Sequence, residues 1–421
     1  MIYMTHQPKL IIGLLGYGVV GKGFYNAVKQ TPGLNVVIKK IVIKHRAKAR
    51  DVDDNLFTDD VEAVLQDDEI NTVVELIDDA KAAYALVKKA MEKGKAVVSA
   101  NKKMIAENFE ALMYLQKQYR VPFLYEASCC ASIPILRCLE EYFAFDEVKS
   151  IKGIINGSTN FILTKMLNSQ LSFSEALAAA QKAGFAEANP ALDVEGHDAA
   201  NKFSILLAHG LGCRVHPREI LYSGITHISK ADIDYALNEK KTIKLLASAQ
   251  KTTDGSVRAF VLPCFIRQDD ELCHVKNELN ALEVEGVFLG RQIFKGKGAG
   301  AYPTAAAVLS DVAAVQKGYQ YPYRKLQEKS TGLKNDFLLD VYISADQLTK
   351  IKISDFKRIK EVQSRLGIHY VLGSIEAGKL LNTNWWKQKG VSLFVTEITY
   401  AQNNLPVSQS VTTNELAEIS M

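Results

Sequence analysis

Four carboxylates and one ammonium gather where the sequence leads into an apolar run. Glu187, Asp193, Glu195 and Asp198 precede Lys202, and the helix-like segment FSILLAHGLG follows directly. Asp198 and Lys202 are four residues apart, so on a helix they share one face. An exposed pair would contribute only about 0.3–0.5 kcal/mol, but the apolar run beyond it favours burial. A buried pair suits acid–base catalysis or forms a structural ion pair, and both interpretations stay open.

A glycine motif near the start of the chain predicts a nucleotide site. The strand-like run KLIIGLL (9–15) leads into GYGVVG (16–21) and then a helical stretch. We expect Gly16 to form a tight turn, Gly18 to let the backbone approach a pyrophosphate, and Gly21 to let the helix pack on the strand. A plain tight turn is the alternative. The loop predicted to bind the cofactor also includes Tyr17, Val19 and Val20.

Basic residues follow the second predicted strand, where the ribose of the cofactor is expected. This stretch reads IVIKHRAKAR, includes Lys44 and Arg46, and has no acid between Gly21 and Asp51. A ribose 2′-hydroxyl calls for a carboxylate, whereas a 2′-phosphate calls for cations. The pattern favours NADP(H) over NAD(H), which the fold also accommodates. A solvated basic edge is the alternative.

Composition excludes several classes of protein. The chain has 421 residues, 48% of them hydrophobic, and a net charge of +4, so it carries no electrostatic signature of a nucleic-acid partner. No apolar stretch reaches the roughly 18 residues of a membrane span, and the start of the chain lacks a signal-peptide core. The cysteines show neither metal spacing nor a disulfide framework. We expect a cytoplasmic protein without a membrane partner.

The order of strand-like and helical segments predicts the architecture. Alternating β and α segments up to about residue 130 predict a doubly wound parallel sheet of the Rossmann type. Residues 131–300 predict an α+β substrate domain with a long helix over 231–250. Residues 300–330 are predicted to return the chain to the nucleotide-binding domain. Residues 335–421 predict a small ACT-like βαββ unit with its helix over 353–367.

Several motifs together resemble the homoserine dehydrogenase family. They run in family order from about residue 10 to 320: GLLGYGVVGKG, VVELI, AVVSANKKMIAEN, YEAS with IPIL, GIINGSTNFIL, ANPALDVEGHDAANK, GITHISKADIDYA with IKLLA, and GKGAGAYPTAAAVLSDV. The resemblance implies NAD(P)H-dependent reduction of L-aspartate 4-semialdehyde to L-homoserine, in threonine, methionine and isoleucine biosynthesis. It also implies a homodimer formed through the middle domain.

The resemblance also assigns roles to residues. It implies that Asp198 and Lys202 form the catalytic pair, with Lys102 also at the reacting oxygen, so that either lysine is a candidate proton donor. Substrate binding is implied for Glu187, Asp193, Asn156, Gly157 and Thr159, and cofactor binding also for Ser99, Asn101, Lys102 and Gly300. A monovalent cation, Na⁺ or K⁺, is implied at Glu126, Cys129 and Ala131.

The chain also departs from the family pattern. Asp78 and Asp79 stand where the family has glycines after ELI. The 129–132 segment CCAS likewise stands where the family has glycines after EAS. The C-terminal unit lacks the usual Pro-Gly turn, so threonine inhibition is not expected. Two alternatives remain: an acyl-forming, aspartate-semialdehyde-type dehydrogenase with Cys129 or Cys130 as nucleophile, and a non-catalytic nucleotide-binding sensor.

Overall fold

The computed structural model describes residues 8–44, 52–327, 332–365 and 368–398. The chain divides into two compact units. Unit 1 takes in the chain up to residue 147 with 201–217 and 294–330, and unit 2 takes in 148–200, 218–293 and the chain from 331 on. Among the helices in these described ranges, none combines the length and the apolarity that crossing a membrane requires.

Unit 1 is built on a parallel six-stranded sheet with the order β3-β2-β1-β4-β5-β6. The strands TVVE and AVVS are buried along their whole length, as expected for parallel strands covered on both faces. The predicted Rossmann-type sheet is confirmed. Its strands are β1 (Leu10–Leu15), β2 (Val36–Val42), β3 (Phe57–Thr58), β4 (Thr72–Glu75), β5 (Ala96–Ser99) and β6 (Phe123–Leu124).

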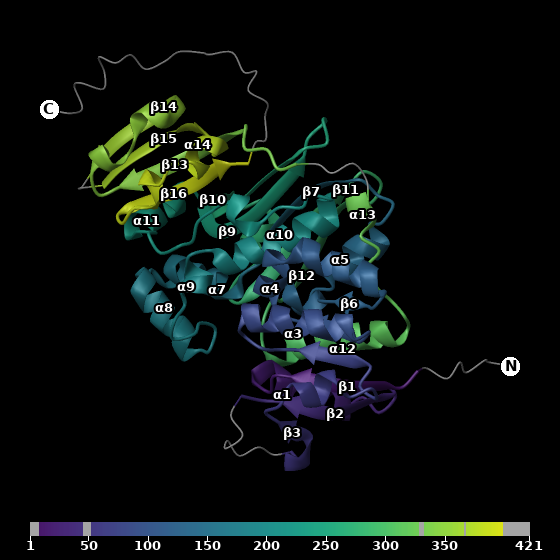
Figure 1. Cartoon of the computed structure of the whole chain (residues 1–421). Helices are drawn as coiled ribbons and strands as arrows, with labels where there is room; N and C mark the ends of the chain where they lie inside the picture. Colours follow the sequence, from purple (N-terminus) through teal and green to yellow (C-terminus); the bar gives the residue numbers. More distant parts are fainter. Residues whose placement is uncertain (1–7, 45–51, 328–331, 366–367, 399–421) are drawn as a thin grey trace. The chain divides into compact units, whose positions relative to one another are not determined.

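Helices connect the strands of unit 1 (Figure 1). The first of them packs closely on a helix from the returning segment 294–330, because a Cβ on Gly23 would lie only 3.1 Å from the Ala301 carbonyl oxygen. The helices are α1 (Val19–Lys29), α2 (Glu62–Leu65), α3 (Ala80–Glu92), α4 (Lys102–Glu107), α5 (Phe109–Tyr119), α6 (Ile135–Arg137), α12 (Ala301–Gln316) and α13 (Arg324–Gln327). Helix α10 (His197–Leu211) begins in unit 2 and continues into unit 1.

A mixed sheet forms the core of unit 2, with the strand order β12-β11-β7-β9-β10-β16-β13-β15-β14 and with β8 beside β10. Strands from the middle and the C-terminal parts of the chain share this sheet. The division into domains at 131–300 and 335–421 stays a prediction. The strands are β7 (Val148–Ile154), β8 (Leu221–Tyr222), β9 (Lys241–Lys251), β10 (Val257–Arg267), β11 (Leu279–Gly286), β12 (Gly290–Lys297), β13 (Leu338–Ala345), β14 (Phe356–Arg365), β15 (Ile368–Glu376) and β16 (Val391–Glu397).

The helix predicted over 231–250 is wrong in its second half. Helix α11 (Lys230–Asn238) ends early, Lys240 adopts a left-handed conformation with φ 52°, and strand β9 follows. The strand pairs with β10 over its full length, and this tertiary pairing overrides local helix propensity. The other helices of unit 2 are α7 (Gly157–Ser169), α8 (Phe173–Lys182), α9 (Ala191–Val194) and α14 (Ala377–Leu381).

The helix predicted over 353–367 is also wrong, because Ile353–Asp355 form a short 3-10 helix and Phe356–Arg365 form strand β14 at the edge of the sheet (Figure 1). Residues 366 and 367 lie outside the described residues. Its apolar residues Phe356, Ile359 and Val362 recur at the spacing of a helix. The pairing with β15 shifts register after Phe356 and again after Ile359. Each irregularity adds a residue, so side chains three apart reach the same core. The C-terminal segment is therefore β-β-β-α-β rather than βαββ.

Candidate active site

The glycine loop of unit 1 has the geometry of a phosphate-binding turn. Gly16 has φ +99°, and a Cβ there would lie 2.6 Å from the Leu76 carbonyl oxygen. A Cβ on Gly21 would lie 2.3 Å from the Gly16 oxygen, whereas a Cβ on Gly18 would meet nothing within 4 Å. No side chain caps α1 at Gly18. Gly16 and Gly21 therefore leave no room for a side chain. The backbone at Gly18, by contrast, is open to a ligand.

The remaining loop residues and the basic edge are also located in unit 1. Tyr17 packs edge-on against Tyr25 and Phe57, with ring centroids 5.9 and 5.1 Å away. Val19 is exposed and Val20 is partly buried. Lys44 is exposed just after β2, as a phosphate-binding cation must be. Arg46 lies outside the described residues.

One of the two unexpected aspartates after β4 has a structural explanation. Asp79 is the N-cap of α3, and its carboxylate accepts hydrogen bonds from the backbone N–H groups of Lys81 and Ala82 at 3.0 and 3.1 Å. These hydrogen bonds, together with the charge of Lys44, lower the pKa of Asp79. The aspartate therefore starts the helix that follows the strand.

A buried carboxylate that sequence reasoning missed connects the ends of β4 and β5. Glu75 accepts a hydrogen bond from Ser99 Oγ at 2.5 Å and one from the Ile77 N–H at 2.7 Å. Burial raises its pKa to about 7. Asn101 donates from its backbone N–H to Ser99 Oγ and from Nδ2 to the Ile77 carbonyl. The signal available was an acid ending an apolar strand, TVVE.

The sequence-predicted lysine of unit 1 begins the helix after β5. Lys102 is the first residue of α4 and is partly buried. Asn101 caps this helix through a hydrogen bond that its side-chain oxygen accepts from the Met104 N–H at 3.0 Å. Ser99 and Asn101 therefore fix the turn that carries Lys102 at the carboxyl end of the sheet, where open α/β sheets bind ligands.

In unit 2, one amide brings two of the predicted carboxylates together. Asn156 Nδ2 donates hydrogen bonds to Asp193 Oδ1 at 2.7 Å and to Asp198 Oδ2 at 2.8 Å. Asn156 is also the N-cap of α7, since its Oδ1 accepts from the Thr159 N–H at 2.8 Å. Two anions held by one amide form a preorganised site for a cationic group.

The other predicted substrate residues lie around α7 and the loop before α9. Gly157 begins α7, and a Cβ there would lie 2.6 Å from the Glu278 carbonyl oxygen. Glu187 is exposed between α8 and α9, and its backbone carbonyl accepts from Gln181 Nε2. No contact described here joins the Glu187 carboxylate to Asn156. The structure brings Asn156, Thr159, Asp193 and Asp198 together.

Helix α10 carries the predicted catalytic pair at its start. Asp198 and Lys202 are one turn apart and are only 4% and 6% exposed, so the surface ion-pair interpretation is wrong. Farther along, His209 is buried, with Nδ1 2.6 Å from Glu140 Oε1 and Nε2 2.9 Å from the Tyr125 hydroxyl. These contacts within unit 1 fix the rotation of the helix about its axis beyond Lys202.

The segment that contains Glu126 and Cys129, where the resemblance implies a cation, is buried in unit 1. Both carboxylate oxygens of Glu126 accept backbone hydrogen bonds, from Leu136 at 2.7 Å and Arg137 at 2.8 Å. Cys129 is fully buried, and its Sγ lies 3.7 Å from the Lys202 carbonyl oxygen. Burial raises the pKa of the Cys129 thiol well above its usual range. This environment opposes the thiolate that an acyl-forming mechanism needs.

Comparisons with known proteins match both parts of the chain. The family model "Homoserine dehydrogenase, NAD binding domain" matches residues 16–126, and the model "Homoserine dehydrogenase" matches residues 134–313. Homoserine dehydrogenase of Bacillus subtilis is 35% identical over 373 residues, which cover 85% of this chain and 86% of that protein. The chain belongs to the homoserine dehydrogenase family.

Other relatives agree with this assignment. The homoserine dehydrogenase of Helicobacter pylori is 37% identical, over 74% of this chain and 75% of its own. The crystal structure of a homoserine dehydrogenase from Thiobacillus denitrificans is similar with a TM-score of 0.81 at 27% identity, covering 93% of this chain and 98% of that one. A homoserine dehydrogenase structure from Staphylococcus aureus has a TM-score of 0.72 at 26% identity and covers 94% of this chain and all of its own.

Family membership settles the reaction. The chain has homoserine dehydrogenase activity, converting aspartate semialdehyde to homoserine (EC 1.1.1.3) in amino-acid biosynthesis, and unit 1 carries an NAD(P)-binding domain. This reaction takes the place of the two alternatives considered from the sequence, the acyl-forming dehydrogenase and the non-catalytic sensor. The roles of individual residues in homoserine dehydrogenase stay predictions.

Removal of the Asn156 amide is the first test of the carboxylate site. Asn156→Ala removes two hydrogen bonds to anions, each worth about 1.5–3 kcal/mol, so we expect the KM for aspartate semialdehyde to rise at least tenfold. Asn156→Ala also removes the α7 cap, which costs about 1 kcal/mol of unfolding free energy. Asn156→Ser is the matched control because serine caps the helix but cannot reach both carboxylates. A wild-type KM in Asn156→Ser would contradict the role of the bridge.

Glu75 predicts a pH dependence of stability. Its folded pKa of about 7 lies above the ordinary 4.5, so the folded state binds the proton more tightly and the unfolding free energy falls as pH rises from 4.5 to 7. The loss reaches about 3 kcal/mol above pH 7. Glu75→Gln should flatten this dependence in urea unfolding at pH 5 and pH 8, while Glu107→Gln, at an exposed position, should not. Equal slopes in Glu75→Gln and wild type would refute the assignment.

Proposed function

We propose that the chain reduces L-aspartate 4-semialdehyde with NADPH in preference to NADH, with Asp193 binding the substrate ammonium, Asp198 and Lys202 forming the catalytic pair, and Lys202 donating the proton. The observation that carries this proposal is the Asn156 amide, which holds both carboxylates at 2.7 and 2.8 Å. A buried and a partly buried carboxylate arranged in this way attract a cation. The α-ammonium of the substrate is the cation that this reaction brings.

The residues of unit 1 fit a dinucleotide. The backbone at Gly18 and the uncapped start of α1 suit the pyrophosphate, because N–H groups at a helix start favour anions. Lys44 is exposed after β2, and Arg46 follows two residues later. Cations at this position favour a 2′-phosphate. When bound, the cofactor supplies the hydride that reaches the aldehyde carbon.

The side chains then complete the reduction. As the aldehyde oxygen becomes an alkoxide, it takes a proton from Lys202 Nζ, and the lysine is left as a neutral amine that solvent reprotonates. Burial of Lys202 and Asp198 supports this role, since a buried acid and its neighbour act with little competition from water. Lys102 is the alternative donor. Glu187 is the second carboxylate proposed for the substrate ammonium.

Four further expectations carry over from the sequence. A Na⁺ or K⁺ ion is proposed near Glu126, Cys129 and Ala131, but the Glu126 carboxylate already accepts two backbone hydrogen bonds and does not fit a cation ligand. Backbone carbonyls are the oxygens left for such an ion, and no step of the reaction depends on it. The homodimer and the cytoplasmic location stay predictions, as does the contact of Gly300 with the cofactor.

Lys202→Met tests the proton donor. General acid catalysis contributes about 10²- to 10⁴-fold in rate, so single-turnover hydride transfer should fall by that factor while NADPH binding stays at the wild-type level. Lys103→Met, at an exposed position on α4, is the control and should keep its rate. A structural role predicts normal transfer with a lowered melting temperature, because removing one member of a buried pair costs about 3–5 kcal/mol. That pattern would exclude Lys202 as the donor.

The cofactor preference is tested at the basic edge. Lys44→Ala combined with Arg46→Ala should weaken NADPH binding about tenfold or more, because each lost charge-assisted hydrogen bond is worth about 1.5–3 kcal/mol. NADH binding should change little. Lys29→Ala is the control, because Lys29 lies at the end of α1 that is away from the glycine loop. Equal losses for the two cofactors, measured by fluorescence titration, would mean that these cations do not read the 2′-phosphate.

A further inference from the structure

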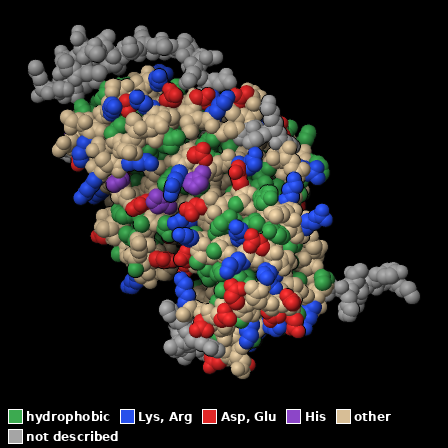
Figure 2. Space-filling view, viewed as in Figure 1, with side chains coloured by type: hydrophobic (Ala, Val, Ile, Leu, Met, Phe, Trp, Pro, Cys, Tyr) green, Lys and Arg blue, Asp and Glu red, His purple; other side chains and the backbone are tan. Residues whose placement is uncertain are grey.

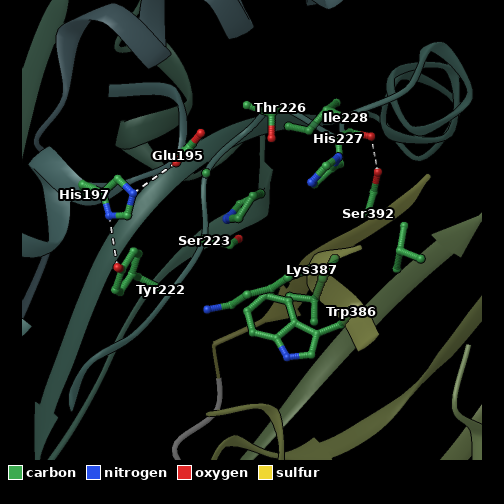
Figure 3. A pocket seen from close by; sticks show the side chains of 14 residues that line it. Glu195, His197, Tyr222, Ser223, Thr226, His227, Ile228, Trp386, Lys387 and Ser392 are labelled. Atoms are coloured by element: carbon green, nitrogen blue, oxygen red, sulfur yellow. Dashed lines mark hydrogen bonds and ion pairs between the residues drawn. The ribbon is translucent and has the colours of Figure 1, made fainter. Parts of the chain in front are cut away.

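Unit 2 contains a cavity that the proposed reaction does not use. It has a volume of about 450 Å³, within the range of small-molecule sites. Its lining comes from the segment that follows β8, from the residues between α14 and β16 together with the start of β16, and from the turn at the start of α10 (Figure 3). Its lining residues are Glu195, His197, Tyr222, Ser223, Gly224, Thr226, His227, Ile228, Pro263, Trp386, Lys387, Val391, Ser392 and Leu393.

The positive charge in this cavity comes from Lys387. Its ammonium lies 5.3 Å from the centre of the Tyr222 ring and 4.8 Å from that of Trp386, and among the described residues no carboxylate pairs with it (Figure 3). Trp386 is almost fully buried, and its Nε1 donates to the carbonyl oxygens of Leu380 and Thr383. Partial desolvation lowers the pKa of Lys387. The lysine is therefore a cation on a rigid aromatic base.

The acidic lining residue, Glu195, already has a partner. Glu195 Oε2 lies 3.1 Å from His197 Nε2, and His197 Nδ1 lies 3.0 Å from the Tyr222 hydroxyl (Figure 3). Histidine side chains also gather beside basic side chains on the face seen in Figure 2. A ligand ammonium would compete with His197 for the one carboxylate, whereas a ligand carboxylate meets Lys387 directly. Chemistry at this cavity therefore favours an anion without an ammonium group.

Backbone contacts link the cavity wall to the turn between Asp193 and Asp198. The Ile225 N–H donates to the Val194 carbonyl at 2.8 Å. A Cβ on Gly224 would lie 1.8 Å from that same oxygen, and one on Gly196, which has φ +86°, would lie 2.6 Å from the Ser223 oxygen. The two segments touch through their backbones, with no side chain between them to absorb movement. A ligand that shifts one segment must shift the other.

We propose that this cavity binds a small organic carboxylate that has an apolar body and no ammonium group, and that binding changes the affinity for substrate through the 194–197 turn. The apolar body would lie against Trp386, Pro263 and Leu393, and the carboxylate would pair with Lys387. The change in substrate affinity rests on the proposed roles of Asp193 and Asp198, whereas ligand binding does not.

Tryptophan fluorescence gives a direct measurement of binding. The chain has two tryptophans, Trp385 and Trp386, so the signal comes from this region alone. We expect 3-phenylpropanoate to change the fluorescence of the full-length protein in a saturable way at millimolar concentration. Phenylalanine, which has the same body and an added ammonium, should bind at least about tenfold more weakly, a difference of about 1.4 kcal/mol.

Variants separate this site from non-specific binding. Lys387→Met should weaken 3-phenylpropanoate binding about tenfold or more, whereas Lys389→Met, at a nearby exposed lysine outside the lining, should not. In steady-state assays, 3-phenylpropanoate should change the KM for aspartate semialdehyde in wild type and not in Lys387→Met, which should keep the wild-type rate without ligand.

Each contrary outcome overturns a stated part of the proposal. Absence of saturable binding, or equal binding by Lys387→Met, would exclude the site, and equal binding of phenylalanine would exclude the discrimination against ammonium. Binding without a change in KM would confirm the site and refute the link to the turn. Because fluorescence needs no turnover, failure of the proposed catalytic roles would leave the binding result standing.

Discussion

The hydrogen bonds of one amide, that of Asn156, organise the carboxylate site of unit 2. The residue follows β7, caps α7 with its oxygen, and holds Asp193 and Asp198 with its nitrogen. The sheet, a helix start and the turn before α10 are thus fixed by a single planar group. Two carboxylates repel each other when both are ionised, and the shared amide donor offsets part of this repulsion. The geometry therefore exists before substrate binds.

Unit 1 solves a related problem mainly with backbone donors, although the Arg137 guanidinium also lies 3.8 Å from the Glu126 carboxylate. Glu75 and Glu126 are both buried, and each accepts hydrogen bonds from main-chain N–H groups at 2.7–2.8 Å. These bonds offset only part of the desolvation, since the pKa values of both carboxyls remain raised. Buried acids held this way fix the turns after β4 and near α6.

The sequence predicted the fold best where the pattern depends on local chemistry. The strand, glycine turn and helix at Gly16–Gly21 needed no tertiary information, and the parallel sheet followed from the alternation. The pairing that Asn156 makes with Asp193 and Asp198 joins residues 37 and 42 positions apart, so residue spacing alone could not reveal it. The C-terminal helix was predicted wrongly because two shifts of register in β14 imitate a helical period.

These same shifts in register have a consequence for the surface of unit 2. Strand β14 is the last strand of its sheet, so within the part of the chain that the structure describes one side of its backbone has no neighbouring strand. A regular exposed edge of this kind invites pairing with other chains and growth into fibrils. The irregular backbone, together with the charged side chains of Lys357, Arg358 and Lys360, makes such pairing unfavourable. The departure from regular geometry thus works against aggregation through this edge.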